Sequence, residues 1–194
     1  IDDLVTKGTN EPYRIMTSRS EYRLLLRQDN ADQRLTRRGY DIGLVSEERL
    51  RAVEEKYAAV DREIRRLTHT GASPSPALSA FLAERGTADV TDGCPLAALL
   101  RRPQLHYDDL APFDPTRPDL PADVREQVEI RVKYEGYIQR QQKQVEEFRR
   151  MESHRLPPGL DYASIQGLRL EAREKLAAVQ PLDLGQAARI SGVS

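Results

Sequence analysis

The sequence has little of several residue types that mark particular classes of protein. It contains one cysteine, Cys94, and no tryptophan among 194 residues, and aromatic residues make up 6% of the chain. One cysteine excludes an internal disulfide and any zinc site built on several cysteines. The three histidines, at positions 69, 106 and 154, share no spacing typical of metal ligands, so no metal site is predicted.

The chain also lacks the long apolar segments that membrane proteins need. No apolar run approaches the roughly 20 residues that span a bilayer, and no charged-then-apolar leader stands at the start. We therefore expect a cytoplasmic protein with no membrane segment. No G-x-G-x-x-G motif is present, so the sequence does not predict that this chain itself holds a cofactor such as FAD.

What the chain does contain is typical of a globular protein with many exposed helical faces. It is 39% hydrophobic and 31% charged, with a net charge of −1. With so small a net charge, contact with nucleic acid has to come from a local basic patch. The chain begins at Ile1 without a methionine, so we expect it to be a portion of a longer protein.

Residues 8–32, GTNEPYRIMTSRSEYRLLLRQDNAD, contain such a patch. Ser18 followed three residues later by Glu21 has the spacing of a capping box, which predicts a helix that starts at Ser18 or Arg19. Arginines then recur every four residues along one face of this helix, and a further arginine precedes it. The arginines predicted to contact phosphate are Arg14, Arg19, Arg23 and Arg27.

Two structural interpretations of these arginines stay open. Arginines at this spacing are often a solvated face whose stems cover apolar surface. They also pair with nearby acids, and Glu21, Asp29 and Asp32 are available. Residues 14–38 contain seven arginines and three acids, a local excess of seven minus three, or +4.

The next segments predict a series of helices. A helix follows Asp29 or Asn30, with Leu35 inward and a left-handed cap at Gly43. Ser46 caps a long helix over 46–68, whose apolar residues alternate steps of three and four, a pattern typical of a helix that packs along another. The members of this seam are Leu50, Val53, Tyr57, Val60, Ile64 and Leu67.

A second long helix is predicted over 123–154, and its apolar stripe makes it the expected partner of the 46–68 seam. Gly136 inside this helix costs about 1 kcal/mol relative to alanine, so we expect a compensating feature such as the close approach of another backbone. Tyr134 and Tyr137 suit stacking on RNA bases. Ordinary packing in the core or against a partner helix is the favoured interpretation of both tyrosines.

A small terminal unit follows the break at Pro157, Pro158 and Gly159. It contains a helix over 168–179 and a second one capped by Asp183, and it is expected to be truncated. Its net charge over 160–194 is zero, with four basic and four acidic residues. The two helices fit either a helix-hairpin-helix module or the first part of a helix-turn-helix.

The sequence thus predicts a mainly α fold, with helix well above half of the residues. The expected architecture is a helical bundle with a long two-helix coiled-coil-like pair and a small C-terminal helical unit. The predicted divisions are an opening segment with the arginine-rich helix, 1–45, a helical domain, 46–156, and the terminal unit, 160–194.

Four literal strings carry a resemblance to a known family. They are EPYRIMTSRSEYRLLLRQDNAD at 11–32, LLRRP at 99–103, VEIRVKYEGYIQRQQ at 128–142 and LGQAARISGV at 184–193. They run from end to end of the chain in the family's order. On these strings the sequence resembles the C-terminal portion of the GidA/MnmG family, flavin-dependent enzymes that modify the wobble uridine of transfer RNA.

The resemblance implies several properties of the complete enzyme. It would bind FAD, use NADH as reductant, form a homodimer and work with the GTPase MnmE. The portion resembled here is implicated in holding tRNA and that GTPase, while FAD and the catalytic cysteines belong to the other half. No catalytic role therefore passes to Cys94, and this chain alone is expected to bind and position without catalysing.

Two alternatives from other classes stay open. One is a coiled-coil protein-interaction adaptor without nucleic-acid binding. The other is a fragment of a helix-turn-helix DNA-binding regulator, which would require a basic recognition helix beyond Ser194.

Overall fold

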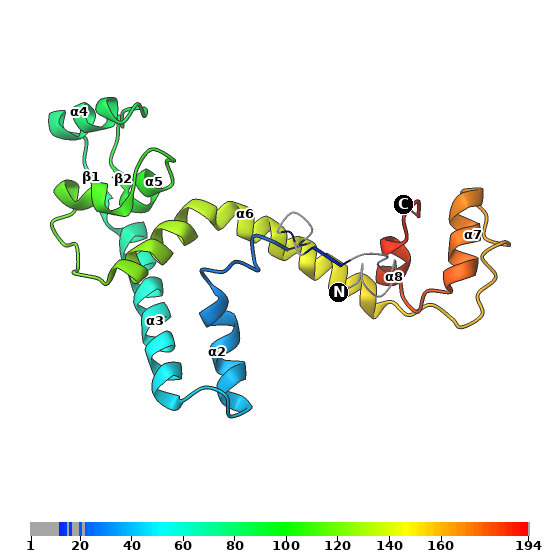
Figure 1. Ribbon diagram of the computed structural model, residues 1–194. Coiled ribbons are helices and arrows are strands. Elements are labelled where there is room, and N and C mark those ends of the chain that lie inside the picture. The colour runs from blue at the N-terminus through cyan, green and yellow to red at the C-terminus, as the bar shows by residue number, and fades with distance from the viewer. Residues whose placement is uncertain (1–11, 15, 17–19, 21, 194) are drawn as a thin grey trace. The chain divides into compact units, whose positions relative to one another are not determined.

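The computed structural model describes residues 12–14, 16, 20 and 22–193 (Figure 1). Helices dominate these residues, and the strands β1 (Gly71–Ala72) and β2 (Cys94–Pro95) contain two residues each. The prediction of a mainly α fold is confirmed. Two compact units form, Ile1–Ile138 and Gln139–Ser194. Within the described ranges, no helix combines the length and the apolar character needed to cross a membrane.

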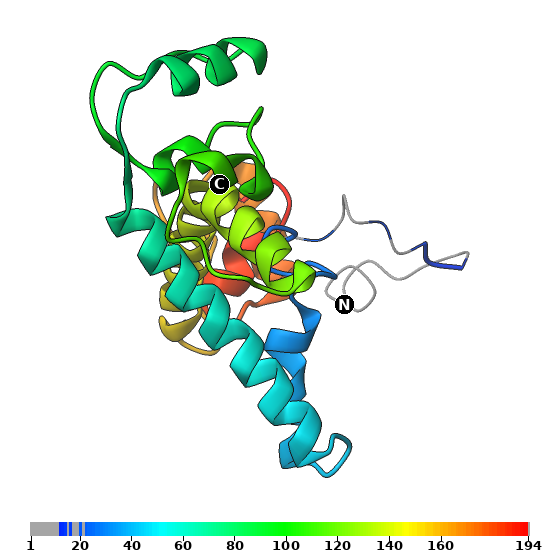
Figure 2. The same cartoon turned by 90° about the vertical axis from the view of Figure 1, so that its left-hand side faces the viewer.

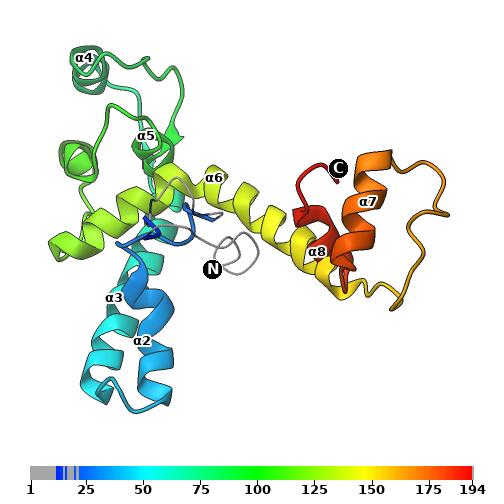
Figure 3. The same cartoon turned by 45° about the vertical axis from the view of Figure 1, so that its right-hand side comes forward.

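In the first unit, helices α2 (Ala31–Asp41) and α3 (Glu47–His69) form a hairpin and lie side by side (Figure 2, Figure 3). Their connection turns at Gly43, whose φ of +77° is the left-handed conformation predicted for it. The predicted cap of α3 is confirmed, because the Ser46 hydroxyl accepts a hydrogen bond from the Arg49 amide at 3.3 Å. The prediction that Leu35 points inward is wrong, because its side chain is 53% exposed and Thr36 is the buried residue of α2.

The apolar seam of α3 is buried inside the first unit. Its buried members are Leu50, Val53, Tyr57, Val60 and Leu67. The prediction that α6 (Ala122–Ser153) packs along the length of this seam is wrong, because α6 crosses α3, and α2 and α5 (Leu96–Leu100) also pack on α3 (Figure 1). The reason lies in α6, whose buried residues end at Val132, so that only its first turns have an apolar face to place against α3.

A leucine-rich core fills the space between α3, the start of α6 and the short elements that connect them. These elements include α4 (Pro76–Glu84) and the 3-10 helix η2 (Tyr107–Phe113). The most deeply buried leucines are Leu67, Leu78, Leu82, Leu96, Leu99, Leu100 and Leu105. The strands pair antiparallel, with Gly71 opposite Pro95. Cys94 is half-buried and packs against this core as a small apolar side chain.

Charged side chains are buried at the end of α3. Glu63 and Asp114 are 3% and 4% exposed, and the Arg66 guanidinium binds both of them. It donates to the two carboxylate oxygens of Glu63 at 2.8 Å each and to those of Asp114 at 3.0 and 2.5 Å. The Tyr107 hydroxyl donates to Glu63 at 2.7 Å. These bonds join α3 to η2 and to the loop that precedes α6.

The second unit contains the end of α6 with α7 (Leu170–Val179) and α8 (Leu184–Arg189). Its small core is built on Tyr162, Leu176 and Ala187. Asp183 caps α8 as predicted, since its carboxylate accepts the Gln186 amide at 2.8 Å. α8 approaches α6 so closely that a Cβ on Gly185 would lie 2.5 Å from Cγ of Glu152, which explains the glycine.

Candidate functional site

The arginine-rich opening stretch does not form the predicted helix over the residues that the structure describes. The predicted helix start, Thr17, Ser18, Arg19 and Glu21, lies outside the described residues. From Tyr22 the backbone makes a turn in which the amides of Leu25 and Leu26 both donate to the Tyr22 carbonyl at 2.9 Å. The prediction of a helix that carries Arg23 and Arg27 is therefore wrong, whereas the helix predicted after Asp29 or Asn30 is confirmed, since α2 begins at Ala31.

Side chains explain why a turn forms here. The Arg27 guanidinium donates to the Leu24 carbonyl at 2.5 Å, and the Asn30 amide donates to the Leu25 carbonyl at 3.0 Å. In a helix, each of these carbonyls would accept an amide four residues later. Side-chain donors that satisfy them instead favour a turn. A spacing of four residues therefore does not place Arg23 and Arg27 on one helical face.

Arg27 is bound within the turn. Its guanidinium donates to both carboxylate oxygens of Asp29, at 2.9 and 3.0 Å, and its side chain is 18% exposed. The hydrogen bond from Arg27 is the main reason that the pKa of Asp29 lies below its ordinary value, against the opposing effect of burial. Gln127 of α6 also donates to the Asp29 carboxylate at 3.2 Å. Asp29, which Arg27 holds in place, thus links this turn to α6 through Gln127.

The other arginines of the predicted phosphate surface differ from Arg27. Arg14 and Arg23 are exposed, and neither forms an ion pair with another described residue. Arg19 lies outside the described residues. The structure thus brings no two of the four arginines into one described cluster, and phosphate contact stays a prediction.

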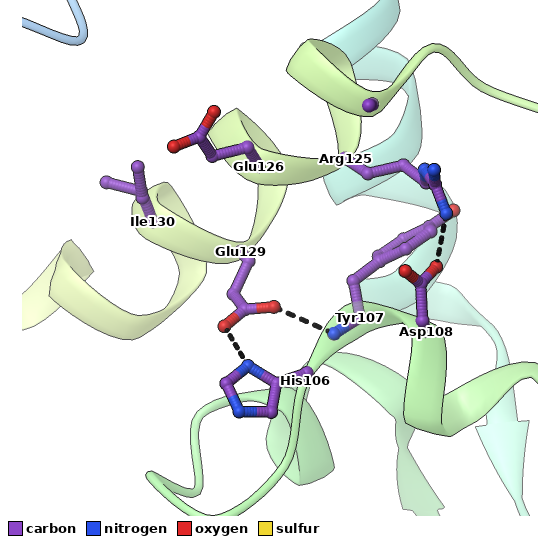
Figure 4. Close-up of a pocket in the computed structure, with 8 residues that line it drawn as sticks. His106, Tyr107, Asp108, Arg125, Glu126, Glu129 and Ile130 are labelled. Atoms are coloured by element: carbon purple, nitrogen blue, oxygen red, sulfur yellow. Dashed lines mark hydrogen bonds and ion pairs between the residues drawn. The ribbon is translucent and has the colours of Figure 1, made fainter.

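A pocket of about 500 Å³ lies between η2 and the start of α6 (Figure 4). Glu129 of α6 joins two neighbours in this pocket, because one carboxylate oxygen lies 2.8 Å from Nδ1 of His106 and the other accepts the Tyr107 backbone amide at 2.9 Å. Beside them, Arg125 donates to the Asp108 carboxylate at 2.5 Å. Sequence reasoning missed this cluster, since 23 residues separate His106 from Glu129 and no local spacing links them.

The chemistry of this pocket is structural. Burial raises the pKa of Glu129, but hydrogen bonds from Lys133, from the Tyr107 amide and from His106 lower it by more. A carboxyl with a lowered pKa is a poor general base near neutral pH. The lining residues include no serine, threonine, cysteine or lysine to act as nucleophile. Over the described part of the chain, no group of three or more His, Cys, Asp or Glu side chains is placed to hold a metal ion.

The middle of α6 presents an aromatic pair to solvent. Tyr134 and Tyr137 are 45% and 57% exposed, and their ring centroids are 6.3 Å apart at an interplanar angle of 53°. Packing of these tyrosines in the core is therefore wrong for this chain, while packing against a partner helix, the other part of the favoured interpretation, stays a prediction. The expected close approach of a backbone at Gly136 is also absent among the described residues, because a Cβ there would meet no atom within 4 Å.

Two family descriptions match successive parts of the chain. Residues 47–142 match the family described as "tRNA modifying enzyme MnmG/GidA C-terminal helical domain". Residues 144–194 match the one described as "tRNA modifying enzyme MnmG/GidA C-terminal helical bundle".

Individual relatives are similar over the whole chain. The protein from Caldicellulosiruptor saccharolyticus named tRNA uridine 5-carboxymethylaminomethyl modification enzyme MnmG is 54% identical, over 100% of this chain and 31% of that relative. The protein of the same name from Bacillus subtilis is 50% identical over the same shares. The form II crystal structure of Aquifex aeolicus GidA is similar with a TM-score of 0.70 and 38% identity, over 100% of this chain and 30% of that one. The chain thus spans 31% of the length of the curated relatives it matches.

Proposed function

Because the chain belongs to the MnmG/GidA family of tRNA-modifying enzymes, as a C-terminal portion, we propose that it holds tRNA and a partner GTPase for a longer, FAD-dependent enzyme. The observation that carries the proposal is the match over 100% of the chain, at 54% identity, to a relative of which it spans only 31%. In this proposal the longer enzyme modifies the wobble uridine, and this portion binds and positions without catalysing.

The residues of this chain do not suit FAD. Dinucleotide sites of this kind need a parallel sheet and a glycine-rich turn that leads into a helix. The two strands here contain two residues each and pair antiparallel, and the sequence has no G-x-G-x-x-G motif. FAD, with NADH as reductant, is therefore assigned to the part of the relatives outside this chain, and no redox step passes through the residues described here.

The tRNA backbone is assigned to residues 14–38, where seven arginines and three acids give a local charge of +4 in a chain of net charge −1. The arginines proposed to contact phosphate are Arg14, Arg19, Arg23 and Arg27. Exposure favours Arg14 and Arg23, whose guanidinium groups are accessible. Arg27 would first have to release Asp29, so its contribution to binding is the smallest of the described three.

The two alternative functions have less support. A coiled-coil adaptor needs an unpartnered seam, but the seam of α3 is buried within this chain, with Val60 and Leu67 at 0% exposure. A DNA-binding regulator needs a basic recognition helix, but the unit that contains α7 and α8 has no net charge over 160–194. The GTPase MnmE, a homodimeric longer enzyme and a cytoplasmic location are parts of the same proposal, supported by the family.

A titration of tRNA onto the chain at several salt concentrations tests this function. We expect binding that weakens as salt rises, because phosphate contacts release counterions. Arg14→Ala and Arg23→Ala should each lower the log–log salt slope by roughly 1, similarly for different tRNA sequences. The matched control is Arg65→Ala, which removes an exposed arginine of α3 outside the opening stretch.

The possible results separate the function from its proposed site. A chain that shows no salt-dependent binding of tRNA lacks the proposed function. If the chain binds tRNA but the Arg14 and Arg23 variants have the same salt slope as the Arg65 variant, the function stands. The phosphate contacts then lie elsewhere in the chain.

A further inference from the structure

Helix α6 contains a buried glutamine among its apolar residues. Gln127 is 3% exposed and stands between Val124 and Val128, which enter the core of the first unit. Its amide nitrogen donates to the backbone carbonyl and to the carboxylate of Asp29, at 3.2 Å each. Its amide oxygen is buried and has no hydrogen-bond partner among the described residues. A buried acceptor without a partner lowers stability, so packing alone does not explain a glutamine at this position.

The contact between Gln127 and Asp29 gives the glutamine a purpose. Asp29 belongs to the turn of residues 22–30 and lies 98 positions away from Gln127 in sequence. One turn further along α6, Arg131 donates to the side chain of Gln33 in α2 at 2.8 Å, so α6 also holds the helix that follows the turn. An apolar residue at position 127 would fit the core but would leave the turn without its hydrogen bonds to α6. Gln127 therefore fixes the turn against α6.

Side-chain hydrogen bonds hold the turn together from within. The Arg27 guanidinium donates to the Asp29 carboxylate and to the Leu24 carbonyl. Arg34 of α2 donates to the Arg27 carbonyl at 3.2 Å and to the side-chain oxygen of Asn30 at 2.9 Å. Because these bonds connect the turn at several points, we expect it to move largely as one piece. An anchor at Asp29 then sets the direction of the whole turn.

Arg23 is an exposed arginine of this turn. It lies inside the hydrogen-bonded part, since the Tyr22 carbonyl accepts the amides of Leu25 and Leu26 at 2.9 Å. A side chain on a backbone that is already fixed loses less freedom when it binds a ligand than one on a loose segment. Gln127 can therefore strengthen a contact between Arg23 and phosphate without touching the RNA itself.

We propose that Gln127 is a positioning residue for tRNA binding, which holds the turn of residues 22–30 through Asp29 so that Arg23 faces the phosphate backbone. This inference rests on the proposed function and adds to it a residue of α6 that acts through another. Gln127 suits a test because it is uncharged and buried. Its replacement by an apolar residue changes neither the net charge nor the surface that RNA can touch.

Gln127→Met removes the donor and keeps much of the size of the side chain. The affinity for a tRNA transcript should fall by roughly two- to tenfold, the cost of ordering one side chain that was previously held. The melting temperature should change little, because the buried oxygen without a partner disappears together with the donor. Hydrogen exchange of the Leu25 and Leu26 amides should become faster, since both are protected by the turn.

A double-mutant cycle shows whether Gln127 acts through Arg23. If it does, Gln127→Met should weaken tRNA binding in the parent but not in a chain that already carries Arg23→Ala. The matched control is Leu78→Ala, which removes a buried side chain of α4, outside both the turn and α6. This control should lower the melting temperature and leave the affinity for tRNA unchanged at a temperature where both proteins are folded.

The results separate the positioning role from the proposed function. If the parent binds tRNA and the Gln127 variant binds it equally well, or if the loss persists in the Arg23→Ala chain, the positioning proposal is overturned and the proposed function stands. An equal loss of affinity in the Leu78 variant would show that binding follows stability, and it would overturn the positioning proposal too. If the parent binds no tRNA at low salt, the proposed function fails and the positioning proposal with it. Circular dichroism spectra that match the parent establish that each variant is folded.

Discussion

Replacing Arg66 with methionine removes the cation that holds two buried carboxylates at the end of α3. Methionine keeps much of the length of the side chain, so the change removes hydrogen bonds and charge more than volume. The guanidinium makes two hydrogen bonds to Glu63, two to Asp114 and one to the Thr116 hydroxyl at 2.9 Å. Both carboxylate side chains are 2% exposed, so water cannot replace the lost donors.

The size of the effect follows from what remains. Glu63 keeps the Tyr107 hydroxyl at 2.7 Å, and Asp114 keeps the Thr116 hydroxyl at 3.0 Å. Neither donor is charged, so two buried anions are left close together without a cation. Removing one partner of a buried ion pair typically costs about 3–5 kcal/mol, and we expect a loss in this range in the free energy of unfolding near pH 7.

The loss should depend on pH in a defined direction. Burial raises the pKa of Asp114, but the hydrogen bonds from Arg66 and Thr116 lower it by more, so it lies below the ordinary value of 3.8. The stability that this lowered pKa provides is complete above pH 3.8 and is lost as the pH falls through the folded-state pKa. Without Arg66, burial raises the pKa of Asp114. Protonation in acid then removes the unpaired charge and reduces the loss of stability in the variant. The difference between parent and variant should therefore be largest near neutral pH and shrink in acid.

Urea unfolding followed by far-ultraviolet circular dichroism measures these values at pH 7 and near pH 4. Arg65→Met is the matched control, since it removes an exposed arginine from the same turn of α3 and should change the free energy of unfolding by no more than about 0.5 kcal/mol. Adding Asp114→Asn to the Arg66 variant should recover part of the lost free energy of unfolding, because it removes one of the two unpaired buried charges. The reasoning is refuted if the Arg66 and Arg65 variants unfold at the same urea concentration at pH 7.

Two further predictions concern burial and capping. Val60→Asp should lower the free energy of unfolding by several kcal/mol, since it buries an unpaired charge at a residue of 0% exposure. The control is Ala58→Asp, on the exposed side of α3. Equal melting temperatures for the two variants would contradict the prediction. Asp183→Ala should lower the free energy of unfolding by about 1 kcal/mol and speed hydrogen exchange of the Gln186 amide. Asp183→Asn should retain most of the capping hydrogen bond. Unchanged exchange in the alanine variant would argue against the capping role of Asp183.

Local chemistry made the helix starts predictable. Ser46 and Asp183 each place a side-chain oxygen where it accepts the amide three residues later, at 3.3 and 2.8 Å. Each contact joins residues three apart in sequence, so no knowledge of the tertiary structure is needed to predict it. The seam of α3 was predictable for the same reason, since its periodicity lies within one helix.

Contacts between distant segments were not predictable in this way. Glu63 falls on the buried side of α3, but a pattern of apolar residues cannot show that Arg66 and Asp114 will accompany it into the core. The prediction of a helix in the opening stretch was wrong for a related reason. Its arginine spacing and capping box favour a helix, but Asn30 and Arg27 satisfy the carbonyls of Leu25 and Leu24 and so favour a turn.

The two errors about α6 have one physical origin. Its apolar stripe was taken as evidence for a partner helix along its whole length, and its glycine as evidence for a neighbouring backbone. The stripe is buried only as far as Val132, and beyond that residue both Gly136 and the tyrosines are exposed. An apolar stripe indicates that a face of a helix packs against a neighbour. It does not show how far along the helix that packing extends, or whether the neighbour belongs to the same chain. The residues of α6 that enter the core of the first unit are Val124, Val128 and Val132, and the periodicity of the stripe does not show where this packing ends.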